Sequence, residues 1–108
     1  MSESNGKVQI LNLTPSGVGG CSPEPAEPVD WKPKKKSLVA IVNSSGADQT
    51  LSNITVGMLK DQAGKEVTHI DVSNKGFWLG TVEQKKGTYE YDDGETSAGP
   101  RTGRIDPS

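Results

Sequence analysis

Residues 37–72 hold the densest apolar pattern of the chain, in three short runs separated by polar turns. Residues 38–42 are apolar at every position, which predicts a central strand that is covered on both faces. Residues 54–58 and 66–72 alternate between apolar and small or polar positions, which predicts half-buried strands. We expect the core of the protein to form in this stretch.

Turn-forming residues separate these runs. Asp61 can accept hydrogen bonds from backbone N–H groups two residues along the chain, and Gly64 can adopt a positive φ. Residues 60–65 are therefore expected to close a hairpin, and residues 43–48 have the composition of another turn. The strand spacing of residues 37–72, with its Asp-x-x-Gly-Lys hairpin, is similar to that of immunoglobulin-like sandwiches in general.

Three further strands are predicted outside residues 37–72. The first covers residues 7–14 and is expected to end before Pro15, which has no N–H to donate to a ladder. The other two cover residues 76–82 and 88–92. Six short strands with no helical period predict an all-β fold, a small antiparallel β-sandwich that is immunoglobulin-like in general style.

Proline and glycine concentrate outside the predicted core. Each proline fixes its own φ and favours an extended conformation in the residue before it, so the segment after the first strand is expected to be polyproline-like. The chain is thereby divided into an N-terminal strand with a Gly/Pro-rich arm (residues 1–36), a sandwich core (residues 37–92) and an irregular C-terminal tail (residues 93–108). Ile105 is the only large aliphatic residue of that tail.

Composition limits the size of the core. The 108 residues suffice for one domain, and 31% of them are hydrophobic, against about 45 to 50% in average globular proteins. Cys21 is the single cysteine, so no intrachain disulfide can form and burial alone must stabilise the fold. The sequence has no apolar signal segment and no run of ~20 apolar residues, so we expect cytosolic synthesis and no membrane span. The final location is left open, with incorporation into a larger assembly as one alternative.

The charge pattern bears on partners. The chain has 12 basic and 14 acidic residues, a net charge of −2. Lys32, Lys34, Lys35 and Lys36 form a basic group between two acidic arms, without the broad basic face that binding to phosphate backbones requires. A nucleic-acid partner is therefore not expected.

Few residues are suited to catalysis. His69 is the only histidine, and Asp71 shares its face of a predicted strand. Residues i and i+2 lie about 7 Å apart along a strand, which predicts a surface histidine with no direct hydrogen bond to Asp71. Cys21 lies in acidic surroundings that raise a thiol pKa, so a reactive nucleophile is not expected. We therefore expect no enzyme, no catalytic residue and no cofactor.

One acidic cluster is a candidate for cation binding. Asp92, Asp93 and Glu95 place carboxylates close together in a turn, but their spacing does not match that of a helix-loop-helix calcium loop. A solvated acidic turn without a metal is the favoured interpretation, and a site for a hard cation such as calcium is the alternative.

Four of the five aromatic residues lie in the last two predicted strands. Side chains alternate between the faces of a strand, so only one of Phe77 and Trp78 can point into the core. Core packing is the favoured interpretation of these aromatics, and an exposed platform for a ligand or partner is the alternative. The candidate binding residues are Trp31, Trp78, Tyr89 and Tyr91.

The favoured function is that of a non-enzymatic assembly or protein–protein interaction module, which binds a protein partner or further copies of itself through its two arms. Small decorating components of large assemblies, viral shells included, are proteins of this kind. The alternative is a carbohydrate-binding or other ligand-binding sandwich, in which Trp78, Tyr89 and Tyr91 stack against the ligand.

Overall fold

The computed structural model describes residues 8–24, 33–83, 85–95 and 100–107. These residues form nine strands and no helix, which confirms the all-β fold expected from the sequence. The strands are β1 (Gln9–Ser16), β2 (Gly20–Glu24), β3 (Leu38–Asn43), β4 (Gln49–Leu51), β5 (Leu59–Asp61), β6 (Ile70–Val72), β7 (Phe77–Val82), β8 (Gly87–Tyr91) and β9 (Arg101–Ile105).

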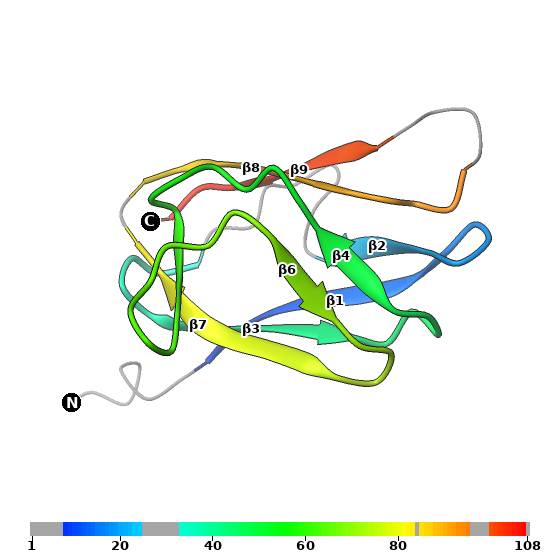
Figure 1. Cartoon of the computed structure of the whole chain (residues 1–108), viewed down its shortest axis with the longest axis horizontal. Coiled ribbons are helices and arrows are strands. Elements are labelled where there is room, and N and C mark those ends of the chain that lie inside the picture. Colours follow the sequence, from blue (N-terminus) through cyan, green and yellow to red (C-terminus); the bar gives the residue numbers. More distant parts are fainter. Residues whose placement is uncertain (1–7, 25–32, 84, 96–99, 108) are drawn as a thin grey trace.

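Two layers of strands pack face to face to form a sandwich (Figure 1). One layer is a five-stranded sheet with the order β2-β1-β3-β7-β5. The other consists of the pairs β4–β6 and β8–β9, which are joined where Ser52 and Glu90 exchange backbone hydrogen bonds of 2.8 and 3.0 Å.

Every strand pair is antiparallel except β1–β3, which is parallel. Parallel neighbours need a connection of about a dozen residues or more. The chain between β1 and β3 comprises residues 17–37, with β2 among them, which is long enough for this crossover. The sandwich therefore contains one pair that the purely antiparallel expectation did not include.

Inner side chains of both layers form one core. Leu11 and Leu13 of β1 and Val39 and Ile41 of β3 are all fully buried. Burial of such a side chain stabilises the fold by about 1.5 to 3 kcal/mol. The other members of the core are Cys21, Leu51, Ile54, Met58, Leu59, Ile70, Val72, Val82, Tyr89, Tyr91 and Ile105.

The hairpin predicted for residues 60–65 is confirmed. Asp61 Oδ1 accepts hydrogen bonds from the N–H groups of Ala63 (2.9 Å) and Lys65 (3.0 Å). Gly64 has a φ of +83°, which favours glycine. These interactions lie within a few residues of one another, and local chemistry of this kind can be predicted from sequence.

Two predicted strands near this hairpin are corrected by the structure. Residues 54–58 form no strand: Ile54 and Met58 are buried, whereas Val56 is 56% exposed. The apolar alternation there marks two points at which a loop is anchored to the core. Of residues 66–72, only β6 is a strand, and it pairs with β4.

Strand β1 continues past its predicted end and includes Pro15. The ladder from β1 to β3 stops at Leu13. Opposite Pro15, the Cys21 N–H points away from β1 and donates to Asp92 O (2.8 Å). The missing N–H of the proline is therefore not needed by either neighbouring strand.

The two predicted arms contain integral strands. β2, in the predicted N-terminal arm, pairs with β1, and β9, in the predicted C-terminal tail, pairs with β8. Ile105 is buried, and a Cβ at Gly103 would overlap the ring of Tyr89, so glycine is needed there. The expected division between a core at residues 37–92 and irregular arms is thus wrong for these segments. Trp31 lies outside the described residues.

Gly20 and Gly94 bring the β1–β2 hairpin directly against the acidic turn that follows β8, in what we call the glycine contact. A Cβ at Gly20 would overlap backbone atoms of Asp93 and Gly94. The adjacent hydrogen bond from the Cys21 N–H to Asp92 O, 2.8 Å long, holds the two segments together. Backbones can approach this closely only where there is no side chain.

Gly20→Ala is expected to lower the free energy of unfolding by about 3 kcal/mol, because the added methyl group would overlap backbone atoms that cannot move without disturbing two strands. Urea unfolding followed by circular dichroism measures the change. Gly19→Asn is the control: Gly19 has a φ of +72° and open space around it, and asparagine accepts that conformation at a cost below about 1 kcal/mol. Equal losses in the two variants would contradict the glycine contact.

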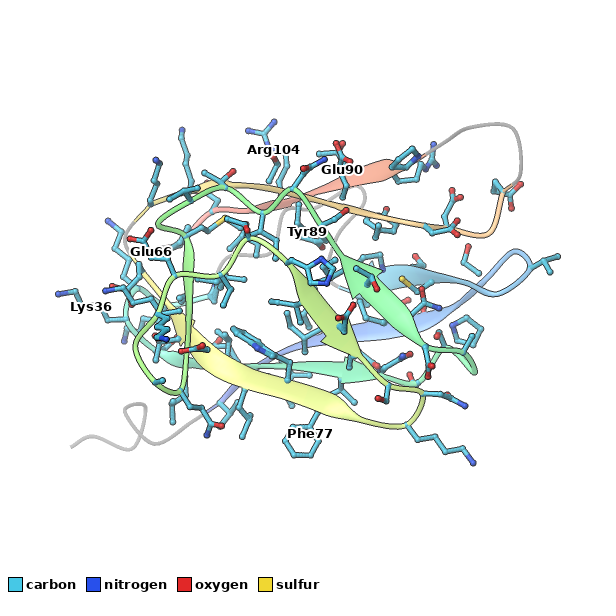
Figure 2. All side chains as sticks on the ribbon, viewed as in Figure 1. Lys36, Glu66, Phe77, Tyr89, Glu90 and Arg104 are labelled. Atoms are coloured by element: carbon cyan, nitrogen blue, oxygen red, sulfur yellow. The ribbon has the colours of Figure 1, made fainter. Side chains whose placement is uncertain are left out.

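Tyr89 is buried with an unsatisfied hydroxyl group. Its side chain lies between the two layers (Figure 2), it is 1% exposed, and its Oη has no hydrogen-bond partner among the described residues. Burial first, and then the nearby Tyr91 and Cys21, raise the pKa of Tyr89 above its usual range. Asn43 is equally buried, but its Nδ2 donates to two backbone carbonyl groups at 2.8 Å.

Tyr89→Phe is expected to raise the free energy of unfolding by about 1 kcal/mol, because it removes a buried polar group that has no partner. Asn43→Leu, the matched control, should lower it by about 2 kcal/mol, because one buried and one partly buried carbonyl group lose their donor. Thermal and urea unfolding report both values. A clear destabilisation by Tyr89→Phe would mean that the hydroxyl is bonded in solution.

Candidate functional site

The candidate aromatic residues do not share an exposed face. Tyr89 and Tyr91 are 1% and 6% exposed, and their ring centroids lie 6.0 Å apart within the core. Trp78 is half-buried against the core, and its indole ring lies over Gly80. The burial of these three residues agrees with core packing, the favoured interpretation, and their rings do not form one exposed surface.

Phe77 is the aromatic residue that points outward. Alternation along β7 places Trp78 on the core side and Phe77 on the other side. Phe77 is 65% exposed and projects away from the interior of the sandwich (Figure 2). The prediction that only one of the two points inward is confirmed, although Phe77 was not among the candidate binding residues.

Phe77 belongs to an apolar surface on the outside of the five-stranded sheet, which we call the outer face. Residues directly opposite one another on neighbouring strands point to the same side of a sheet. The opposite pairs that define this surface are Ile10–Ala40, Ala40–Leu79, Val42–Phe77 and Leu38–Thr81. The outer face therefore consists of Ile10, Leu38, Ala40, Val42, Phe77 and Leu79.

Much of the outer face is in contact with solvent. Ile10 is 54% and Leu38 48% exposed, so β3 is central in its sheet but is not covered on both sides as predicted. Among the described residues, six large hydrophobic side chains are exposed, and three of them, Ile10, Leu38 and Phe77, lie on this surface. The continuous apolar run of β3 shows that both faces of this strand are apolar. It does not show that only one of these faces is covered by a second layer of strands.

Lysines lie at both ends of the outer face. Lys34, Lys35 and Lys36 come shortly before β3, and Lys75 comes shortly before β7. The two strands are antiparallel, so these lysines lie at opposite ends of the sheet. The outward positions of β1, β3 and β7 themselves carry no charged side chain.

Lys60 of β5, opposite Thr81, also lies on the side of the outer face and pairs with Glu83 at 3.7 Å. Glu24 of β2, opposite Asn12, lies on it at the Lys75 end. The surface is thus apolar in the middle, with more lysines than carboxylates towards its ends.

His69 and Asp71 form the direct contact that the sequence analysis did not expect. His69 Nε2 lies 3.0 Å from Asp71 Oδ2, and Thr50 Oγ1 donates to Asp71 Oδ1 at 2.7 Å. The prediction assumed that both residues lie in one flat strand, but β6 begins at Ile70. The hydrogen bonds from Thr50 and His69 lower the pKa of Asp71. His69 is exposed, as predicted.

The carboxylates of the acidic turn are held in different environments. Asp93 is 6% exposed, and its Oδ2 lies 3.0 Å from Arg101 Nε. Asp92 is exposed, and its Oδ1 accepts a hydrogen bond from the Gly94 N–H (2.8 Å). Glu95 is also exposed. Within the described ranges, no three acidic, cysteine or histidine side chains are placed to share a metal ion.

A pocket of about 450 Å³ opens beside the acidic turn, and we call it the end pocket. The glycine contact holds the tip of the β1–β2 hairpin at this turn. Neighbouring parts of the pocket come from β4 and β8, so its elements are far apart in the sequence, and sequence reasoning could not bring them together. The end pocket is lined by Val18, Thr50, Ser52, Tyr91, Asp92, Gly94, Glu95 and Pro100.

Cys21 lies in the core next to the acidic turn. Its burial, together with the negative charges of Asp92 and Asp93, raises the pKa of the thiol from 9.0 to about 11. The predicted direction of this shift is confirmed, with burial as its largest cause. The thiol therefore remains protonated at neutral pH, and it is a poor nucleophile.

Comparison with known proteins assigns no family to the chain. No protein-family model and no curated protein sequence matches it. A solved structure of an amicyanin mutant, in its reduced Cu(I) form at pH 4, is similar with a TM-score of 0.48 and 11% sequence identity, over 94% of this chain and 82% of that chain. A likeness this distant carries no function to this protein. None of the described residues forms a helix that could cross a membrane.

The stability of the protein is expected to fall as the pH rises from 9.0 to about 11, in part because of Cys21. The thiol of the unfolded chain ionises at a lower pH than that of the folded protein, so alkaline conditions favour unfolding. Cys21→Ala should lose stability less steeply over this range. Urea unfolding of both proteins at increasing pH tests this, and parallel curves would contradict a raised thiol pKa.

Proposed function

We propose that this protein is a non-enzymatic protein-interaction module whose docking surface is the outer face. The observation that carries the proposal is the gathering of Ile10, Leu38 and Phe77, which are 48 to 65% exposed, on one side of one sheet. Contact between apolar side chains and water is unfavourable, and a partner that covers them gains this free energy. A rigid sheet also holds its side chains ready for binding, which lowers the entropic cost of association.

The charge distribution selects the kind of partner. A segment of another protein with apolar residues in its middle and acidic residues at its ends would match the outer face, because lysines lie at both ends of this surface. A second copy fits less well. Two outer faces packed on each other by a twofold axis would bring lysines against lysines, whether the facing strands run in the same or in opposite directions.

The proposed docking surface is the outer face and not the two arms, through which the sequence analysis expected a partner to bind. The segments assigned to these arms contain β2 and β9, which are strands of the sandwich.

The surroundings of the histidine support a non-enzymatic role. In the described part of the chain, the hydrogen bond of the His69 ring is to Asp71, and the Thr50 hydroxyl donates to the same carboxylate instead of to the histidine. A general base that activates a hydroxyl group requires the opposite arrangement.

Peptides selected from a random display library against this protein are expected to be apolar in the middle and acidic at both ends. Phe77→Lys should weaken their binding at least tenfold, because it places a charge within the apolar contact in place of its most exposed aromatic side chain. Fluorescence polarisation with labelled peptides measures the dissociation constants.

Val56→Lys is the matched control. Val56 is 56% exposed, much like Ile10, but it lies in a loop outside the outer face, so binding should change less than about twofold. Circular dichroism checks that both variants are folded. Peptides without a preference for acidic ends, or with equal affinity for Phe77→Lys, would refute the proposal. A wild-type dimer in light scattering that Phe77→Lys converts to a monomer would replace the acidic partner by a second copy.

A further inference from the structure

The end pocket is independent of the outer face. It is built around β4, β8 and the β1–β2 hairpin, whereas the outer face is carried by β1, β3 and β7. Its volume of about 450 Å³ lies within the range of ~300 to 1,000 Å³ that is usual for small-molecule sites. The backbone around it is fixed by the glycine contact and by the Ser52–Glu90 hydrogen bonds.

The lining of the end pocket combines apolar and acidic groups. Val18, 86% exposed, and Pro100 are the aliphatic residues of the lining, and Tyr91 is its aromatic residue. Asp92 and Glu95 supply carboxylates. A ligand that satisfies all of these groups has an apolar body and a positive charge.

Among the described residues, no basic side chain neutralises the negative charge of the pocket. Arg101, the nearest basic residue in the chain, is held by the buried carboxylate of Asp93 at 3.0 Å. In the part of the chain that the structure describes, Asp92 and Glu95 form no ion pair, and no basic side chain lines the pocket. Within the described ranges, the two acidic residues that line the pocket thus have no counter-charge, while the third carboxylate of the turn is paired.

We propose that the end pocket binds a small organic cation, an alkylammonium ion whose positive group lies near Asp92 and Glu95. Its carbon atoms would lie against Val18 and Pro100, and its N-methyl or N-methylene groups would contact the ring of Tyr91. Aromatic rings attract such cations, most strongly where water is partly excluded. Tyr91 as a residue is only 6% exposed and is packed in the core, so the part of it that lines the pocket is held rigidly.

Other ligand classes fit the pocket less well. A calcium ion takes six to eight oxygen ligands, and this pocket has two carboxylates beside aliphatic walls. An anionic ligand would be repelled by both carboxylates. A neutral ligand would gain no attraction from their charge.

Choline is a suitable probe, and 3,3-dimethylbutanol is its neutral counterpart of nearly the same shape. In a titration followed by ¹H–¹⁵N NMR, millimolar choline is expected to shift the amide signals of residues 91–95, and the alcohol should bind at least tenfold more weakly. Added salt should weaken choline binding, because it screens the carboxylates.

The variant Asp92→Asn/Glu95→Gln should bind choline at least tenfold more weakly. It is expected to fold, because asparagine keeps the Oδ1 atom that accepts the Gly94 N–H. Glu66→Gln removes the same kind of charge from an exposed position between β5 and β6, and it should bind as the wild type does. Failure of choline to bind, equal binding of the alcohol, unchanged binding by the double variant, or shifts confined to other parts of the protein would each overturn the proposal.

Discussion

The burial of a limited number of apolar side chains between two layers of strands holds this protein together. Hydrophobic residues make up only 31% of the chain, and its single cysteine is a free thiol in the core. Burial and backbone hydrogen bonds must therefore supply the favourable free energy of folding. The exposure of Ile10, Leu38 and Phe77 supports a docking role for the outer face. A chain with so few apolar residues loses stabilising burial when three of them remain exposed on one surface.

A second constraint is the glycine contact, which fixes one end of the sandwich. Because Gly20 and Gly94 have no side chains, the hairpin and the acidic turn can meet backbone to backbone. The same arrangement places Asp92 and Asp93 beside the buried thiol of Cys21 and raises its pKa. The chemical character of the end pocket, acidic at the turn and apolar elsewhere, thus depends on residues that carry no chemistry of their own.

The two surfaces differ in charge character, because lysines outnumber carboxylates around the outer face. Lysines lie at the ends of the outer face, whereas carboxylates line the end pocket. The net charge of −2 gives no indication of this separation. The separation of lysines from carboxylates arises from the fold. Strands that are distant in sequence lie side by side, and this brings charged residues of different turns to the same end of the molecule.

Local features were predicted well and distant pairings poorly. The hairpin at residues 60–65 depends on Asp61 and Gly64, whose partners lie within four residues. Strand β9 was missed because its inward positions are Gly103 and Ile105, and the glycine makes sense only with the ring of Tyr89 against it. The alternation at residues 54–58 was misleading, because a loop anchored at two points has the same pattern as a strand.

The sequence by itself determined that the protein is all-β, that it folds without a disulfide, that Cys21 is a weak nucleophile, and that one of two adjacent aromatic residues must be exposed. These properties follow from composition, from the alternation of side chains and from neighbouring charges. Only the tertiary structure decided which residues lie on the uncovered side of the sheet and which loops enclose the pocket. Strand order and close backbone contacts set these features, and they depend on the packing of the whole chain rather than on any one segment.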